Sequence, residues 1–315
     1  MDKTIWHELE PDNIFKAVEG ALGERLSNLL LKRNSYVNRV YELEKHDPAE
    51  RVIVKFYRPH RWSSEMIIEE HKFLEELSAK ENPVIAPLKV KGRTLFTFKD
   101  IPFALFPKRG GRAMDEFDEE TWKILGRLIA RLHLVGEKHK RSKRITWRPT
   151  SATKHHLEGL AKTDYVLPDF KKAFFDAAEA FIKKAEPLFG KQEFILLHGD
   201  LHKGNLIHRP GEGIYFIDFD DIALGPPVQD IWMLLPDKPE NCKRELGLLL
   251  DSYETFRRFD KKSLDLVPIL RGMRIIHFVY WLAMQSGEPD FHNHFPEAGT
   301  KKYWNEVTRD LQGII

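Results

Sequence analysis

Two short polar stretches, each next to an apolar run, carry the residues best suited to chemistry. The first follows the apolar run 195–197 and holds Asp200 and, five residues later, Asn205. The second begins with Asp218, directly after the apolar run 214–217. Transfer of a phosphoryl group needs a carboxylate that orients the attacking hydroxyl and accepts its proton, together with oxygen ligands for a metal ion at the phosphates. The three polar residues could supply both.

We therefore expect Asp200 to be the proton acceptor, and Asn205 and Asp218 to be metal ligands, with Asp218 counted among the catalytic residues as well. An Asp followed five residues later by an Asn has the spacing of the catalytic loop of kinases. Mg²⁺ prefers carboxylate and amide oxygens and keeps several waters, so a sparse ligand set shared with ATP is sensible. The expected cofactors are ATP and Mg²⁺. A surface turn would not require these residue types at this spacing.

The elements that must position these residues fall into two groups. Short strand-like runs surround a helical segment in the first hundred or so residues, and the rest is mostly helical apart from a strand-rich stretch at 194–219. We expect an α+β fold with two lobes, residues 1–107 and 108–315. The first would be a small lobe with an antiparallel sheet, and the second would be mainly helical.

The hydrophobic periodicity predicts the individual elements. In the N-terminal lobe it predicts helices over 12–31 and 64–77, and strands over 35–43, 51–57, 83–90, 93–99 and 103–106. In the C-terminal lobe it predicts helices over 121–133, 170–189, 228–235, 242–256 and 267–284.

The bulk composition narrows the class of protein. A net charge of +2, left from 50 basic and 48 acidic residues, predicts no general attraction to nucleic acid or to a membrane surface. Cys242 is the single cysteine, so no intramolecular disulfide and no cysteine-based metal cluster can form. We find no apolar stretch of signal-peptide length at the start and no heptad seam. We expect a cytoplasmic monomer.

The polar stretches also carry a family signature. His198, Gly199, Asp200, His202 and Asn205, followed by Asp218 and Asp220, match the pattern His-Gly-Asp-x-His-x-x-Asn followed by Asp-x-Asp. The sequence thereby resembles the aminoglycoside-phosphotransferase and choline-kinase group of kinase-like enzymes. Within that group it is most similar to the bacterial stress response kinase A type, on the blocks 34–41, 54–59, 69–71 and 226–234. The resemblance covers roughly residues 5 to 285.

The resemblance implies further residues around the nucleotide. Ser35 would lie in a loop over the ATP phosphates, where 34–38 replaces the Gly-rich loop of protein kinases. Lys55, on a strand, would hold the α- and β-phosphates and pair with a Glu on the following helix. Glu70 is favoured because the core residues of that helix lie behind it, although Glu69 stays open.

The segment 103–108, with Phe106 and Lys108, would be the hinge whose backbone reads adenine. Asp230 would brace the backbone of the catalytic loop. His198 and His202 are expected to position that loop rather than to act on substrate.

The nature of the acceptor is left open by the residues alone. The subfamily resemblance implies transfer to Ser or Thr of proteins in a bacterial stress response, whereas the wider group includes kinases of small alcohols such as choline, homoserine or aminoglycosides. Glu288, Asp290 and Phe291 could position a cationic small substrate. Two other classes of function remain as alternatives: a metal-dependent phosphohydrolase that uses His198, Asp200, His202 and Asp218, and a non-catalytic nucleotide-binding module.

Overall fold

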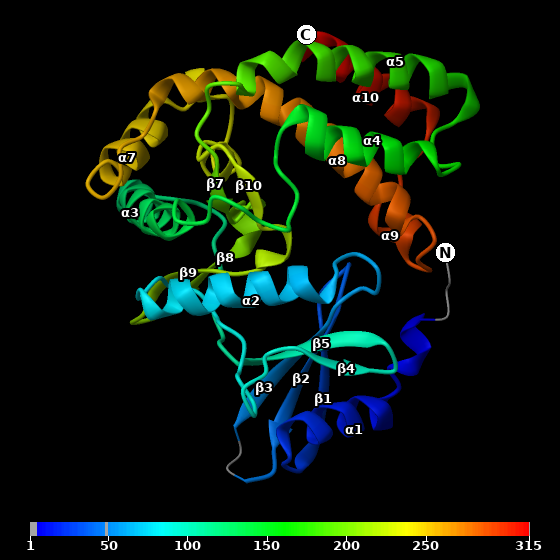
Figure 1. Ribbon diagram of the computed structural model, residues 1–315, viewed down its shortest axis with the longest axis vertical. Helices are drawn as coiled ribbons and strands as arrows, with labels where there is room; N and C mark the ends of the chain where they lie inside the picture. Colours follow the sequence, from blue (N-terminus) through cyan, green and yellow to red (C-terminus); the bar gives the residue numbers. More distant parts are fainter. Residues whose placement is uncertain (1–4, 48–49, 315) are drawn as a thin grey trace. The chain divides into compact units, whose positions relative to one another are not determined.

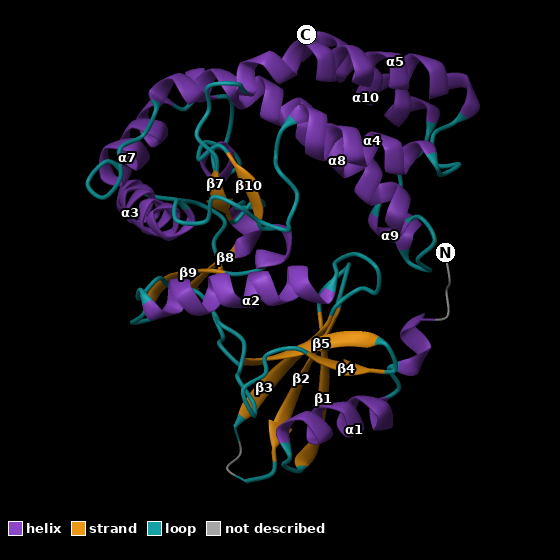
Figure 2. Ribbon diagram, in the orientation of Figure 1, coloured by secondary structure: helices purple, strands orange, loops and turns teal. Residues whose placement is uncertain are grey.

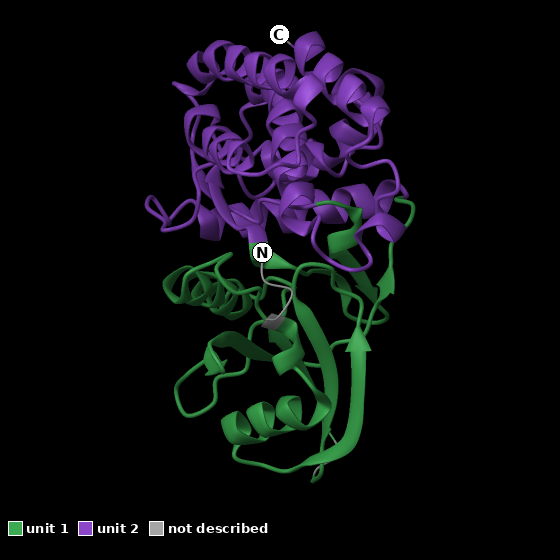
Figure 3. Ribbon diagram, turned by 90° about the vertical axis from the view of Figure 1, so that its right-hand side faces the viewer, with its two compact units in different colours: residues 1–117, 202–220 green, residues 118–201, 221–315 purple. Residues whose placement is uncertain are grey.

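The chain forms two compact units in a computed structural model that describes residues 5–47 and 50–314. Unit 1 comprises residues 1–117 and 202–220, and unit 2 comprises residues 118–201 and 221–315 (Figure 3). We expected a single boundary at 107/108. By its contacts, 202–220 instead belongs with the N-terminal residues: its strand at 206–209 pairs with a strand at 112–113, and its second strand, at 213–216, pairs with the first.

Unit 1 is built on a five-stranded sheet in the order β1-β2-β3-β5-β4, in which every neighbouring pair is antiparallel. This confirms the expected antiparallel sheet. A smaller antiparallel sheet has the order β6-β8-β9. The strands are β1 (Leu26–Arg33), β2 (Arg39–Lys45), β3 (Arg51–Phe56), β4 (Phe96–Phe98), β5 (Ile101–Pro107), β6 (Arg112–Ala113), β8 (Leu206–Arg209) and β9 (Gly213–Phe216).

One face of the large sheet is covered by helix α1 (Pro11–Leu22), whose apolar side packs on strand residues such as Val54 and Phe103 (Figure 1). The helix ends at Gly23, whose φ of 75° is a left-handed conformation that glycine adopts without strain. The predicted helix over 12–31 is therefore wrong beyond Leu22. The apolar residues that follow belong to β1, because they pair with β2 after this break.

Helix α2 (Ser64–Ala79) begins where the Ser63 hydroxyl accepts a hydrogen bond from the Met66 N–H, as is typical of an N-cap. Its buried Ile67 packs against Ala104 of β5. The predicted strand over 83–90 is wrong: only the bridges of Val84 and Val90 form there. Prolines at 83 and 87 lack the N–H that a central strand donates.

Unit 2 is almost wholly helical, with one two-stranded antiparallel ribbon (Figure 2). The expected long helices are confirmed, whereas α6 is shorter than the predicted 228–235, and α4 and α10 were not predicted. The elements are α3 (Glu119–Gly136), α4 (Lys154–Ala161), α5 (Pro168–Ala185), β7 (Ile195–Leu197), β10 (Ala223–Gly225), α6 (Gln229–Trp232), α7 (Lys243–Tyr253), α8 (Val267–Gln285), α9 (Phe291–His294) and α10 (Lys301–Ile314).

Among the described residues, the stretch Lys261–Gln285, which includes α8, is long and apolar enough to cross a membrane by length and composition. However, 56% of its most apolar window is buried inside the protein. The core helix of a folded protein has the same properties, and α8 packs against α4 and α10.

Helices α3 and α7 pack closely because α3 carries a glycine where they meet. A Cβ at Gly126 would lie 2.1 Å from the Leu249 carbonyl oxygen of α7. No side chain fits at that distance, so the spacing of the two helices depends on this residue. Gly247, within α7 itself, faces open space.

We predict opposite effects for the same substitution at these two glycines. Gly126→Ala should lower the free energy of unfolding by about 2 kcal/mol or more because the helices must separate. Gly247→Ala should raise it by about 0.5–1 kcal/mol, because alanine loses less backbone entropy in a helix. Thermal unfolding of both variants checks this, and equal effects would contradict the packing.

Candidate active site

The loop 198–200 in unit 2 has a backbone conformation that only glycine tolerates at its centre. Gly199 has a φ of 84°, and a Cβ there would lie 2.1 Å from the Asp221 carbonyl oxygen. Both observations exclude a larger side chain. The glycine of the signature thus sets the direction in which the chain presents Asp200.

Asp230 of α6 holds this loop from below. Its two carboxylate oxygens accept hydrogen bonds from the His198 N–H and the Gly199 N–H, each at 2.9 Å. Gln229 donates from Nε2 to the Gly199 carbonyl oxygen at 3.1 Å. Since Asp230 is completely buried, these bonds are charge-assisted in a dry environment. The prediction that Asp230 braces the loop is confirmed.

A buried histidine continues the brace. His133 Nε2 of α3 lies 3.3 Å from the Asp230 carboxylate, and its Nδ1 lies 2.9 Å from the Tyr253 hydroxyl. Because a carboxylate only accepts, Nε2 carries the proton and the Tyr253 hydroxyl donates to Nδ1. Burial lowers the pKa of His133, partly offset by Asp230. A neutral imidazole therefore orients the carboxylate.

Asp200, the predicted proton acceptor, lies in the same unit and has a charged neighbour that the sequence did not suggest. Arg274 Nη1 of α8 is 2.7 Å from Asp200 Oδ1. The side chain of Asp200 is 18% exposed, so it can be reached by the hydroxyl of a phosphoryl acceptor. No motif marks Arg274, because it is separated from Asp200 by 74 positions, from 200 to 274.

A pocket of about 250 Å³ lies within unit 1 and gathers most of the remaining predicted site residues. Apolar side chains form much of its wall, and basic and acidic groups lie among them, as is usual for small-molecule sites. Its lining residues are Asn34, Ser35, Asn38, Val40, Ile53, Lys55, Glu70, Leu74, Ile85, Phe106, Pro107, Arg109, Phe216, Ile217, Asp218 and Phe219.

Lys55 of β3 is the charged centre of this pocket. Its side chain is 13% exposed, and its ammonium hydrogen-bonds the Asp220 carboxylate and lies 3.5 Å from Asp218 Oδ1 and 4.0 Å from Glu70 Oε1. Burial alone would lower the pKa of Lys55, but the carboxylates outweigh it and raise the pKa above its usual range. Lys55 is therefore charged, and the structure places Glu70 near it.

Asp220 is itself buried, and several donors share its carboxylate. Besides Lys55, its carboxylate accepts from Arg61 Nη1 at 3.1 Å and from the Asn38 amide. Burial raises the pKa of Asp220, yet the nearby Lys55 and Arg61 charges lower it to about 2. Arg61 was not predicted, since no sequence pattern connects it with a residue so far along the chain.

A backbone hydrogen bond beside the small sheet brings Asp218 and Asn205 near each other. The Ile217 N–H donates to the Asn205 carbonyl oxygen at 3.0 Å, one residue before Asp218. Asp218 has a φ of 62°, a conformation that costs energy for a non-glycine residue, and its side chain is 55% exposed. A carboxylate and an amide oxygen are the hard donors that suit a divalent cation at phosphates.

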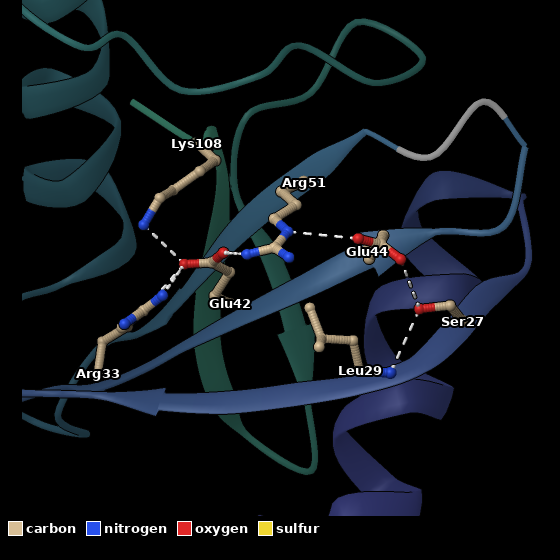
Figure 4. Close-up of polar contacts among 7 residues, drawn as sticks. All are labelled: Ser27, Leu29, Arg33, Glu42, Glu44, Arg51 and Lys108. Carbon is tan, nitrogen blue, oxygen red and sulfur yellow. Dashed lines mark hydrogen bonds and ion pairs between the residues drawn. The ribbon is translucent and has the colours of Figure 1, made fainter. Parts of the chain in front are cut away.

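Of the other predicted nucleotide residues, Ser35 and Phe106 line the pocket, whereas Lys108 does not. The Lys108 ammonium donates to Glu42 at 2.6 Å instead (Figure 4). His202 accepts from the Gly204 N–H at 3.0 Å, which is a local capping contact of the expected positioning kind.

The chain matches the family described as "Phosphotransferase enzyme family" over residues 32–266.

The chain belongs to this phosphotransferase family.

Named relatives of the phosphotransferase span nearly its whole length. Stress response kinase A of Escherichia coli (strain K12) is 35% identical over 305 residues, 95% of this chain and 90% of the relative. The protein named Serine/threonine protein kinase RdoA of Salmonella typhimurium is 34% identical with the same coverage. Amicoumacin kinase hAmiN, solved with AMP-PNP, Ca²⁺ and Ami, is similar in fold, with a TM-score of 0.78, 19% identity, and coverage of 98% of this chain and 96% of that chain.

These findings confirm the expected resemblance, the two-lobed α+β class and an ATP-dependent phosphotransferase. They favour group transfer over the hydrolase alternative.

Within residues 5–47 and 50–314, no cluster of three or more His, Cys, Asp or Glu residues is arranged to hold a metal ion. Asn205 and Asp218 supply an amide and a carboxylate, which are oxygen donors of the kind that Mg²⁺ prefers, so the metal-ligand role remains a prediction for this pair.

Replacing the bracing carboxylate should slow catalysis without touching the reacting groups. In Asp230→Asn one oxygen becomes an NH₂ group that faces a backbone N–H, so the loop must shift. We predict a fall in kcat of about tenfold or more and a loss of about 1–3 kcal/mol in stability. The exposed Asp237→Asn should change neither, and steady-state kinetics with thermal unfolding compare them. A normal kcat in Asp230→Asn would contradict the brace.

The buried His133 should make stability depend on pH. Because its pKa is lowered in the folded state, the unfolded state binds more protons between the folded pKa and about 6.5, so the free energy of unfolding falls as the pH drops through that range. In His133→Gln this slope should decrease by at most about 1.4 kcal/mol per pH unit. Denaturant titrations from pH 7.5 to 5 measure it, and identical slopes would contradict a neutral buried imidazole.

Proposed function

We propose that the chain transfers the γ-phosphate of ATP, in the presence of Mg²⁺, to the hydroxyl of Ser or Thr residues in proteins. The observation that carries the proposal is one pocket within unit 1, in which Ser35, Lys55, Glu70 and Asp218 meet. Membership of a phosphotransferase family gives this pocket its chemistry.

Different residues of the pocket would contact different parts of the nucleotide. Lys55 is the cation for the α- and β-phosphates, held in place by Glu70 and Asp220. Ser35 lies in the loop that covers the phosphates. Phe106 and its backbone neighbours form the apolar wall for adenine.

Asn205 and Asp218 would hold the metal. When bound, Mg²⁺ neutralises phosphate charge and orients the transferring group. The side chain of Asp218 is 55% exposed, which suits a ligand of a metal ion that arrives with the nucleotide.

Asp200 acts on the acceptor. As the acceptor oxygen forms its bond to the γ-phosphorus, the bond from that phosphorus to the bridging oxygen breaks, and the Asp200 carboxylate takes the hydroxyl proton. Arg274 fixes the rotamer of Asp200 through its 2.7 Å contact. Asp230 fixes the backbone on which Asp200 lies.

The relatives support a protein acceptor. Proteins about one third identical over 95% of the chain carry the names Stress response kinase A and Serine/threonine protein kinase. A small-alcohol acceptor is the second candidate, favoured by the likeness to amicoumacin kinase, which extends to the fold alone at 19% identity. Phe291 is 1% exposed, so its ring is not accessible to a cationic small substrate.

The proposal extends to the setting. We place the chain in the cytoplasm as a monomer that serves a stress response, with protein substrates as partners and neither nucleic acid nor membrane as a target. The near balance of 50 basic and 48 acidic residues supports the absence of a general attraction to nucleic acid or to a membrane surface.

Transfer of labelled γ-phosphate tests the function directly. Wild type with ATP and Mg²⁺ should label Ser or Thr of a generic protein acceptor, and chelation of the metal should abolish the label. Asp200→Asn should lose about 100-fold or more of the rate, because general base catalysis and acceptor orientation are removed.

Two neighbouring glutamates give a matched control. Glu70→Gln should slow transfer by weakening the Lys55 ion pair, whereas Glu69→Gln should leave the rate within about twofold. Label found only on a panel of small alcohols would keep the mechanism and replace the acceptor class. Release of free phosphate alone, insensitive to Lys55→Met, would overturn the kinase proposal.

A further inference from the structure

A second charged cluster lies in unit 1 outside the groups that the reaction uses. Glu42 of β2 is completely buried, and its carboxylate accepts from Arg51 Nη1 at 2.8 Å, from Arg33 Nε at 2.9 Å and from Lys108 Nζ at 2.6 Å (Figure 4). The three cations come from three different segments: β1, β3 and the residue after β5. One carboxylate therefore joins four stretches of chain.

The physical chemistry makes this junction strong. Burial raises the pKa of Glu42, but hydrogen bonds from Lys108, Arg33 and Arg51 outweigh it and lower the pKa to about 2. The carboxylate is thus ionised at any physiological pH. A buried charge of this kind is tolerated only while its partners stay in place, so it fixes their positions.

The strand register places the junction beside the nucleotide pocket. Glu42 is paired with Ile53 of β3, and Ile53 is paired with Phe106 of β5. Val40, two residues before Glu42 and so on the same face of the sheet, also lines the pocket. Glu42 is thus the cross-strand neighbour of Ile53, which lines the pocket.

Lys108 is the contact with functional consequence. Its neighbours Pro107 and Arg109 both line the pocket, while its own side chain is held by Glu42. Its N–H also donates to the Arg51 carbonyl oxygen at 3.3 Å. Of the two adjacent basic residues, Lys108 is therefore turned to the sheet and Arg109 to the pocket.

We propose that Glu42 is a positioning residue for nucleotide binding: by holding Lys108 it sets the conformation of Pro107 to Arg109, and so the shape of the pocket wall. This inference rests on the proposed ATP-binding role of the pocket. Glu42 touches no reacting atom, so its loss should weaken nucleotide binding and leave the transfer step itself largely unchanged.

The first test compares two glutamates on the same face of β2. Glu44 is bound by Arg51 Nε at 3.3 Å and, like Glu42, can be changed to Gln. Glu42→Gln should raise the KM for ATP and the Kd of a non-hydrolysable ATP analogue by about fivefold or more, with kcat within about twofold of wild type. Glu44→Gln should change neither constant by more than about twofold.

The second test separates positioning from general stability. Lys108→Met and Arg33→Met each remove one cation from Glu42, but only Lys108→Met releases the segment at the pocket. We expect Lys108→Met to raise the Kd at least about threefold more than Arg33→Met, at similar melting temperatures. Equal Kd values in the two variants, or a change in melting temperature with no change in Kd, would overturn the proposal.

Wild-type binding keeps the two hypotheses apart. If wild type binds no nucleotide, the proposed function fails first. If wild type binds the analogue and Glu42→Gln binds it equally well, the function stands and only the positioning role of Glu42 is rejected.

Discussion

The buried ammonium of Lys55 is the interaction on which unit 1 depends. A cation at 13% exposure is tolerated only with anionic partners, and those partners come from α2, as Glu70, and from the segment after β9, as Asp218 and Asp220. One charge therefore places the sheet, helix α2 and the turn at 218–220 relative to one another. The same balance explains Arg61, which supplies a second cation to Asp220.

Unit 2 uses a buried carboxylate for a different purpose. The Asp230 carboxylate is satisfied by two backbone N–H groups and by neutral His133. Such bonds fix the path of a loop more tightly than a side-chain ion pair, because the backbone donors have no rotamers of their own. Together with Gly199, this brace determines how Asp200 is presented. Asp230, which is not expected to contact substrate, thus controls the position of Asp200, the expected proton acceptor.

The sequence predicted the residues that belong to a chemical motif and the elements that follow from a short hydrophobic period. Asp230 could be placed because its role belongs to a motif, and the antiparallel sheet followed from alternating strands. The end of α1 could not, since apolar spacing continues across Gly23 from a helix into a strand and only its backbone conformation marks the break. Glu42 and Arg274 were missed because each gains its meaning from partners distant in sequence. Lys108 was located in the right segment, but the direction of its side chain depends on Glu42, which no local pattern reveals.

The discontinuity of unit 1 limits how such a protein can be divided or recombined. The residues 202–220 complete the unit, and the Phe216 N–H donates to the Pro83 carbonyl oxygen at 2.9 Å. A fragment that stops at 117 would lack Asp218 and Asp220, which are the closest carboxylates of Lys55. A single genetic crossover in the linker at 117/118 would therefore join a lysine to foreign carboxylates. Residues 1–117 and 202–220 are consequently expected to be inherited as one block rather than exchanged as modules.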